Sequence, residues 1–224
     1  MKTLKTSLLI AAIVVASTNI YSQSNKKKNN SSPVESGGSM CFNENSHILN
    51  LGIGFGGGNY YSGYYGFGYN YKVSPAFSLS YEQAIPKKLG PGFLGLGAYF
   101  GYQTSSSTYN YFWDKHGYNN NYYYKNSWTN FMIAARGAYH LDILNSEKAE
   151  LYFGLLAGLR IQSYNYESNN PDPYADNYRL SSGNVYPAYS LFIGGRYYFT
   201  PNIGLFAELG YGISYFTGGI SIKF

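Results

Sequence analysis

The most constraining feature of this sequence is a strand pattern in which large apolar residues alternate with glycine. In LNLGIGFGGG, residues 49–58, the leucines, Ile53 and Phe55 fall on one strand face, and small or polar residues fall on the other. Gly52, Gly54 and Gly57 also have the spacing of a dinucleotide-binding loop, which requires a helix directly afterwards. The residues that follow have no apolar repeat at helical spacing. The pattern therefore predicts a strand with one bulky face and one minimal face.

The same alternation returns along the chain and predicts about eight strands. The clearest segments have roughly ten residues, which is the length that a tilted strand needs to cross a bilayer. We therefore predict an all-β fold, a transmembrane antiparallel up-and-down β-barrel of about eight strands. The predicted strands are Leu49–Gly58, Ala76–Ala84, Phe93–Tyr102, Phe131–Leu141, Leu151–Ile161, Ala188–Phe199, Ile203–Ile213 and Gly218–Phe224.

The predicted connections also point to a membrane barrel. The segments IPKKLGPG, NSEKAE and TPN give short turns after alternate strands, whereas Thr104–Ser127 and Ser163–Tyr186 give two long loops. Long loops without structure are uncommon in a compact soluble domain. Short turns at one end and long loops at the other are typical of outer-membrane barrels.

The composition decides which strand face lies inside. A soluble, lipocalin-like barrel would keep the bulky residues inside and expose glycine, although only 12% of the residues are charged. In a membrane barrel the bulky residues face lipid, and the narrow lumen of eight strands needs small residues. We therefore expect Gly52, Gly54 and Gly56 to make room in a lumen.

Charged residues at strand positions give an independent indication. In each strand they fall on the face opposite the large apolar residues, and a cation facing lipid at mid-depth costs about 2 to 4 kcal/mol. We predict a lumenal ion-pair network, with the lysine nearer the rim, that holds the barrel closed; a conducting path is the alternative. Its members are Glu82, Arg136, Arg160, Arg196, Glu208 and Lys223.

The N-terminal segment is typical of an exported protein. Lys2 and Lys5 precede the apolar run Leu8–Ala16, which predicts a cleaved signal peptide over residues 1–22. Residues 23–46, with Lys26–Lys28, are poor in apolar residues and predict a disordered periplasmic linker before a barrel over 47–224. The formal net charge of +5 falls to 5 − 2 = +3 without Lys2 and Lys5, which is too small to indicate nucleic-acid binding. Cys41 has no cysteine partner within the chain.

Few residues suggest chemistry, whereas the long loops suggest recognition. His140 with Asp142 lies at the short-turn end, and His116 with Asp114 lacks a recognisable partner, so we predict no enzyme, no metal site and no cofactor. Tyrosine and tryptophan are favoured in recognition surfaces, although residues near strand ends also form interfacial girdles. The candidate residues for a protein or glycan partner are Tyr111, Phe112, Trp113, Tyr123, Tyr166, Asp172, Tyr174 and Asp176.

The C-terminal TGGISIKF carries the most specific resemblance. Thr217, Gly219, Ile222 and Phe224 resemble the terminal signal that small bacterial outer-membrane β-barrel proteins, OmpX-like or opacity-protein-like, present to their assembly machinery. The resemblance implies the outer membrane of a Gram-negative bacterium, contact with its lipid and lipopolysaccharide, and insertion by that machinery. Family members serve mostly as adhesins, complex subunits or membrane-stabilising proteins, so we expect a structural or interaction role. The alternatives are a small porin-like channel and, after it, a lipid-modifying or proteolytic enzyme.

Overall fold

The computed structural model describes residues 41–57, 69–115, 118–141, 143–144, 146–170 and 182–224, and these residues form β-strands joined by turns. They belong to one compact unit, Gly38–Phe224. Among them, no helix has the length and apolar character of a membrane span. The strands are β1 (His47–Phe55), β2 (Tyr69–Val73), β3 (Ala76–Leu89), β4 (Gly92–Lys115), β5 (Tyr118–Leu141), β6 (Ala149–Ser168), β7 (Ser182–Tyr198), β8 (Ile203–Gly210) and β9 (Phe216–Lys223).

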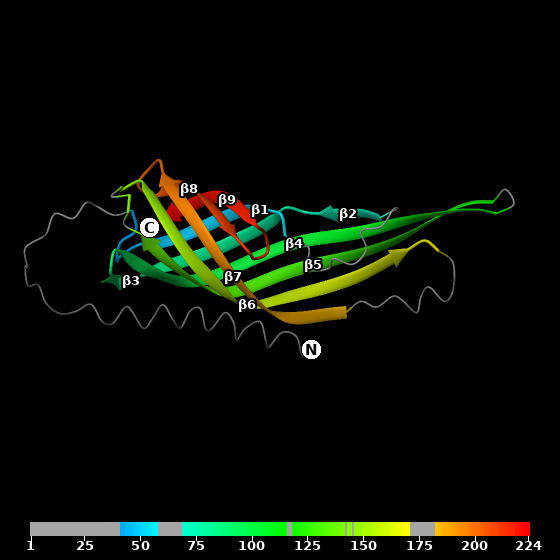
Figure 1. The fold of residues 1–224 in the computed structure, drawn as a ribbon, viewed down its shortest axis with the longest axis horizontal. Helices are drawn as coiled ribbons and strands as arrows, with labels where there is room; N and C mark the ends of the chain where they lie inside the picture. The colour runs from blue at the N-terminus through cyan, green and yellow to red at the C-terminus, as the bar shows by residue number, and fades with distance from the viewer. Residues whose placement is uncertain (1–40, 58–68, 116–117, 142, 145, 171–181) are drawn as a thin grey trace, which may run out of the picture. The chain divides into compact units, whose positions relative to one another are not determined.

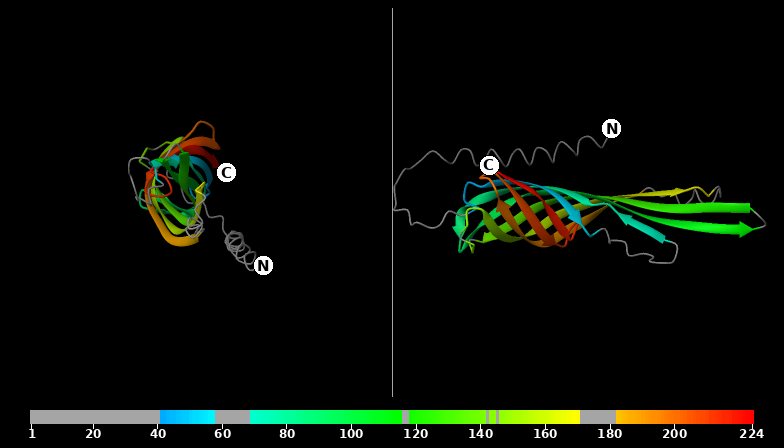
Figure 2. Two further views of the ribbon diagram at one scale, coloured as in Figure 1. Left: turned by 90° about the vertical axis from the view of Figure 1, so that its right-hand side faces the viewer. Right: turned by 90° about the horizontal axis from the view of Figure 1, so that it is seen from above.

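The strands close into an antiparallel ring (Figures 1 and 2). Each strand from β3 to β9 pairs with the next, and β1 joins β3 to β9. The short β2 pairs with β4 beyond the end of β3, so β2 and β3 follow one another along the same edge of β4. The predicted all-β barrel of about eight strands is therefore confirmed.

The long loop predicted at Thr104–Ser127 is wrong. β4 and β5 stay paired from Gly92↔Leu141 to Lys115↔Tyr118 and form a long hairpin that continues past the other strands (Figure 1). Its outer part is rich in Ser, Thr, Tyr and Asn, which pair well across strands but show no apolar face. β6 likewise extends to Ser168 and β7 begins at Ser182, within the second predicted loop.

The two faces of the barrel wall differ as the alternation predicts. Large apolar side chains point outward, and Leu191 is 74% exposed and Ile193 64% exposed. Many inward positions hold small, polar or charged residues, among them Gly52 and Gly54, where a Cβ atom would clash with neighbouring lumenal side chains. Gly56 does not share this position. It follows the end of β1, exposed and with a φ of 74°, because the chain turns there.

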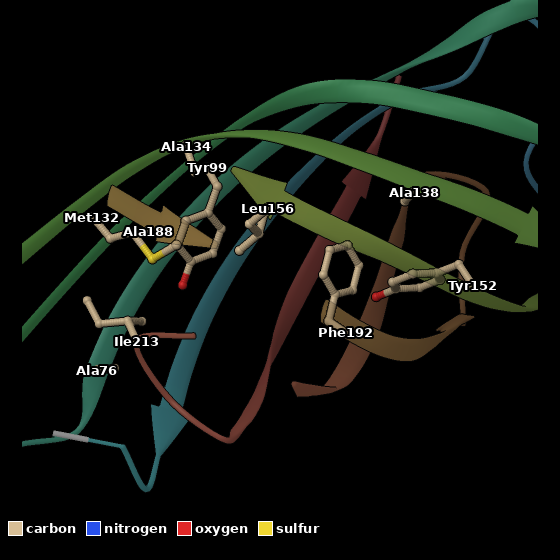
Figure 3. Close-up of a cluster of buried hydrophobic side chains, with 10 residues drawn as sticks. All are labelled: Ala76, Tyr99, Met132, Ala134, Ala138, Tyr152, Leu156, Ala188, Phe192 and Ile213. Atoms are coloured by element: carbon tan, nitrogen blue, oxygen red, sulfur yellow. The ribbon is translucent and has the colours of Figure 1, made fainter. Parts of the chain in front are cut away.

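Side chains pack together inside the described part of the ring. An apolar cluster occupies one part, with Tyr99, Met132, Leu156 and Phe192 pointing inward (Figure 3). Ile213, from the connection between β8 and β9, is 4% exposed and packs into the same cluster. A ring of eight strands leaves space only for side chains, and this cluster occupies part of that space.

Candidate functional site

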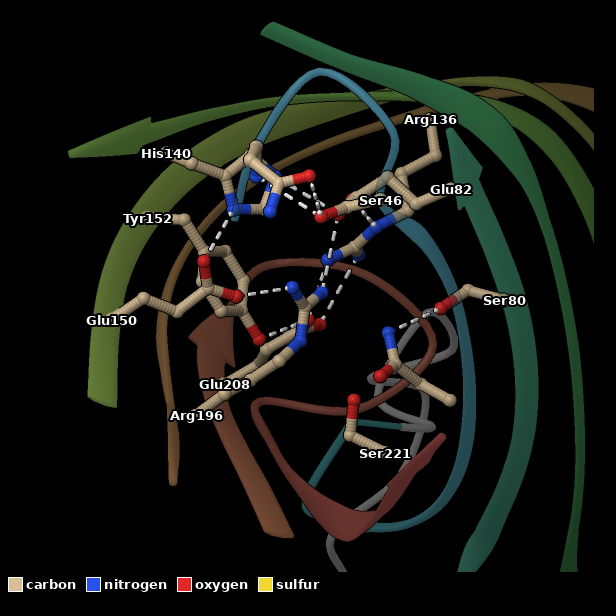
Figure 4. A network of polar contacts seen from close by, with 12 residues as sticks. Ser46, Ser80, Glu82, Arg136, His140, Glu150, Tyr152, Arg196, Glu208 and Ser221 are labelled. Carbon is tan, nitrogen blue, oxygen red and sulfur yellow. Dashed lines mark hydrogen bonds and ion pairs between the residues drawn. The ribbon is translucent and has the colours of Figure 1, made fainter. Parts of the chain in front are cut away.

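The most distinctive site is a buried polar network at the short-turn end of the lumen (Figure 4). Five strands supply its side chains, and the strand alternation turns all of them inward. The members are Glu82 from β3, Arg136 and His140 from β5, Glu150 and Tyr152 from β6, Arg196 from β7, and Glu208 from β8. Apart from Glu208, whose side chain is 11% exposed, they are almost fully buried.

Glu82 is the centre of the network. Its carboxylate accepts from Arg136 Nε at 2.9 Å and from Arg196 Nη2 at 3.2 Å. Arg136 also donates to Glu208 at 2.6 Å, and Arg196 donates to Glu150 at 2.5 Å. Each guanidinium therefore bridges two carboxylates, which is the geometry that its forked donors favour.

His140 lies between two carboxylates. Its Nε2 is 2.9 Å from Glu82 and its Nδ1 is 3.1 Å from Glu150; only the second contact is aligned as a hydrogen bond. The imidazole ring stacks on Phe42 at a centroid distance of 3.6 Å. Three carboxylates and two guanidiniums leave one negative charge, which a protonated His140 would balance.

Aromatic rings surround the cations. Arg136 lies over the Phe192 ring at 4.0 Å, and Arg196 lies over the Tyr152 ring at 4.3 Å. The Tyr152 hydroxyl donates to Glu208 at 2.9 Å. These cation–π contacts stabilise charges that water cannot reach.

Glycines in the strands between the partners allow the network to form. Gly97 of β4 pairs with Glu82 on one side and with Arg136 on the other. Because Gly97 has no side chain, the Glu82–Arg136 contact passes over it. Gly194 of β7 stands in the same way between Tyr152 and Glu208, and its Cβ would lie 2.7 Å from Tyr152 Cζ. Each of these glycines leaves space through which side chains from the strands on either side make contact. We call such a glycine a window.

The structure brings four of the six predicted network residues together: Glu82, Arg136, Arg196 and Glu208. Lys223 lies at the short-turn end, where it donates to the Cys41 carbonyl at 3.3 Å and lies over the Tyr198 ring. Arg160 lies farther along β6, where it lines a cavity together with Gln162 and Tyr186.

Sequence reasoning missed Glu150, Tyr152 and the place of His140 in the network. Glu150 lies in NSEKAE, which has the composition of a turn, and β6 begins only one residue earlier. Extending the alternation back from Tyr152 by two residues would have placed Glu150 inside. Asp142 and His116, considered as catalytic partners, lie outside the described residues.

The candidate recognition residues are spread over the long hairpin and beyond it. Tyr111, Phe112 and Trp113 belong to β4, and Tyr123 and Tyr166 belong to β5 and β6. Asp172, Tyr174 and Asp176 lie outside the described residues. A row of aromatic rings crosses β2, β4 and β5. The centroid of the Tyr109 ring lies 4.7 Å from that of Tyr69 and 6.4 Å from that of Tyr124. Such cross-strand aromatic pairs stabilise the extension.

The C-terminal motif lies at the seam that closes the ring. Thr217, Gly219 and Ile222 are in β9 and pair with β1. The Phe224 ring stacks on His47 at 5.9 Å, and the two backbones exchange hydrogen bonds. The motif therefore forms one half of the closing strand pair.

Residues 41–46, which were predicted to belong to the linker, pack against the short-turn end. Cys41 and Phe42 are 3% and 1% exposed, and the Ser46 carbonyl accepts from the Ala84 amide at 3.0 Å. We call residues 41–46 the cap. Because Phe42 stacks on His140, the cap covers the ion-pair network. The rest of the predicted linker and the predicted signal peptide lie outside the described residues.

The cap gives a prediction for thiol chemistry. Burial, with a smaller contribution from Glu150, raises the pKa of the Cys41 thiol to about 12. Because the thiolate is the reactive form, we expect maleimide labelling of the folded protein at pH 8 to be roughly a thousandfold slower than labelling of the urea-unfolded chain. Phe42→Ala should loosen the cap and speed labelling. Equal rates in the folded and unfolded states would contradict the packed cap.

No protein-family model matches this chain, and no curated protein matches it. Among solved structures, it is similar to Ail, the attachment invasion locus protein of Yersinia pestis, with a TM-score of 0.40, 12% identity, and coverage of 81% of this chain and 99% of Ail. A structure of Ail with the heparin analogue sucrose octasulfate gives a TM-score of 0.39 and 11% identity, with 80% and 99% coverage.

The N-terminal β-barrel domain of Pseudomonas aeruginosa OprF gives a TM-score of 0.40 and 15% identity, with coverage of 81% of this chain and 98% of the domain. For the described residues, the barrel follows from the chain's own strand registers. It is a closed antiparallel ring.

Proposed function

We propose that this protein is an integral β-barrel of the outer membrane of a Gram-negative bacterium, with a non-enzymatic structural or interaction role. Export would use the predicted signal peptide, and Thr217, Gly219, Ile222 and Phe224 would be the signal for the barrel assembly machinery. Outer-membrane lipid and lipopolysaccharide would surround the apolar wall. The β4–β5 hairpin would stand outside the bilayer, where a protein or glycan partner can reach it.

The observation that carries the membrane proposal is the inside-out distribution of side chains. Apolar residues cover the outer wall, with Leu191 at 74%, Ile193 at 64% and Leu209 at 58% exposure. Glu82, Arg136 and Arg196 are buried inside the ring instead. An exposed apolar surface of this extent is unfavourable in water and favourable in lipid.

The apolar cluster and the ion-pair network inside the ring support a structural role over a channel. Tyr99, Met132, Leu156 and Phe192 pack together inside the ring, and the Arg136 guanidinium lies over the Phe192 ring. The carboxylates and guanidiniums of the network are engaged with each other rather than lining a wet path. A pore of useful conductance would need these contacts to open.

Photo-crosslinking in intact cells tests both halves of the proposal. We expect p-benzoylphenylalanine at Leu191 to form adducts with lipid, because this position faces the hydrocarbon. At Asn165, exposed on the outward face of the β6 extension, we expect adducts with a non-lipid partner. Thr200, exposed in the β7–β8 turn, is the control for the opposite end and should give neither adduct.

The two positions separate the two claims. Absence of lipid adducts at Leu191, or lipid adducts at Asn165, would contradict the placement of the bilayer. A correctly inserted protein without any discrete non-lipid adduct at Asn165 would contradict the interaction role.

A further inference from the structure

The cap is held over the ion-pair network by a contact with a titratable side chain. Phe42, the buried aromatic residue of the cap, lies flat on the His140 ring, with 3.6 Å between the ring centroids and 9° between the ring planes. Phe42 also packs with Ile48 and Ala84. Because Phe42 covers one face of the imidazole, the charge of His140 bears directly on whether the cap stays in place.

Both ring nitrogens of His140 face carboxylates (Figure 4). Nε2 lies 2.9 Å from Glu82 of β3, and Nδ1 lies 3.1 Å from Glu150 of β6. Among the described residues, the other groups beside the ring are uncharged: the Tyr152 ring lies at 5.3 Å, and β4 presents Gly95. A protonated imidazole has an N–H on each nitrogen and can serve both carboxylates, whereas a neutral imidazole has only one N–H. The arrangement therefore fits the charged form.

The nearby cations do not remove the need for this proton. Arg136 and Arg196 bind the same carboxylates, but with Glu208 the network holds three carboxylates and two guanidiniums. Lys223 is half-buried and donates to a backbone carbonyl of the cap. Loss of the His140 proton therefore leaves the network with an unbalanced negative charge, which is costly in a site that water does not reach.

Docking of the cap and protonation of His140 support each other. With the cap in place, His140 is 1% exposed, so only the network can balance the charges around it. With the cap displaced, water reaches the ring and solvates the carboxylates, and a neutral imidazole then costs less. A charged ring is also attracted to the aromatic face of Phe42. The docked cap therefore favours the protonated ring, and the stability of docking is present at low pH and lost as the pH rises.

We propose that the cap is a pH-dependent latch, in which protonated His140 holds Phe42 and residues 41–46 over the ion-pair network and deprotonation releases them. Release exposes Cys41 and the short-turn end of the network to water, while the strands of the ring stay paired. The latch is a property of the fold beyond the structural or interaction role proposed above, and it requires no partner molecule.

Hydrogen–deuterium exchange of the protein folded in neutral detergent tests the latch. The reporters are the amides of residues 41–46 and the Ala84 amide, which donates to the Ser46 carbonyl at 3.0 Å. Exchange is measured at about pH 6 and about pH 9, and the urea-unfolded chain at each pH is the reference for base-catalysed exchange. We expect protection at the lower pH that falls by up to about tenfold per pH unit through the transition. The amides of the β1–β9 pair should stay protected at both pH values.

Three variants separate the proton from the packing of the ring. His140→Gln keeps a polar side chain but cannot carry the charge, so protection of the cap should be low at both pH values. His47→Gln removes the other histidine of the described strands, whose Nδ1 lies 2.8 Å from the Tyr81 hydroxyl, and should keep the wild-type pH profile. Glu150→Gln removes one negative charge, so a neutral His140 balances the network and the cap should stay protected at the higher pH.

Three results would overturn the proposal: equal protection of the cap at the two pH values, a wild-type profile in His140→Gln, or loss of protection in the β1–β9 pair together with the cap. The last would mean that the whole ring opens. If His140→Gln does not fold, Glu150→Gln decides alone. The latch predicts that the cap stays protected in this variant at the higher pH, whereas a purely structural role of the carboxylate predicts loss of protection at both pH values.

Discussion

The Glu82→Ala variant is expected to lose about 3 to 5 kcal/mol of its free energy of unfolding. Glu82 is fully buried and contacts Arg136, Arg196 and His140. Removing its carboxylate leaves Arg136 Nε and Arg196 Nη2 without their acceptor in a site that water does not reach, and breaking a buried ion pair by removing one partner is strongly destabilising. The measurement is urea unfolding of the protein folded in phosphatidylcholine vesicles.

A second ion pair in the same chain is the matched control. Lys125 and Glu167 are 3.2 Å apart on the hairpin, with side chains 39% and 48% exposed. Lys125→Ala should therefore cost less than about 1 kcal/mol. Glu82→Gln keeps the volume and removes the charge, so it separates packing from electrostatics. Equal urea midpoints for Glu82→Ala and Lys125→Ala would contradict a stabilising network.

The Gly97→Val variant is expected to destabilise the barrel by at least about 3 kcal/mol, more than a typical overpacking mutation. An added Cβ at Gly97 would lie 1.8 Å from the Tyr81 carbonyl oxygen, which is backbone and cannot rotate away. The new side chain would also stand between Glu82 and Arg136. Steric strain and loss of the ion pair therefore act together.

Gly137 provides the control for glycine replacement as such. It lies on the outward face of β5, one residue from Arg136, and its Cβ would meet only Leu96 Cδ2, at 3.6 Å. Gly137→Val should be close to neutral in the vesicle unfolding assay. If both variants were equally stable, the window at Gly97 would have no role. If both variants were strongly destabilised, the loss of stability would be a general effect of replacing a strand glycine.

The inward direction of the network side chains was predictable from the two-residue period of the strands. Alternation alone places Glu82, Arg136, Arg196 and Glu208 inside, because one residue's direction determines the direction of all others in its strand. The pairing of each carboxylate with a particular guanidinium depends on the register between strands. The sequence of a single strand does not determine that register. The windows at Gly97 and Gly194 follow from register in the same way.

The length of the hairpin was not predictable from apolar patterning. Ser105, Ser106 and Ser107 continue β4 beyond the apolar wall, where neither strand face is strongly apolar. Without a buried face there is no amphipathic period to read. β2 was missed for the same reason, since YNYKV has only polar and aromatic residues beside one valine. Pairing with β4 orders these residues where their own pattern does not.

The seam between β1 and β9 has a consequence for how the barrel forms. His47 and Phe224 exchange backbone hydrogen bonds, and β1 and β9 pair as antiparallel neighbours. Contacts so distant in sequence form slowly, because a long chain segment must be ordered first. Until the contacts between them form, β1 and β9 each have an edge with unpaired backbone N–H and C=O groups, and such edges promote aggregation. Ring closure should therefore be a late step in folding, after the hairpins between neighbouring strands have formed.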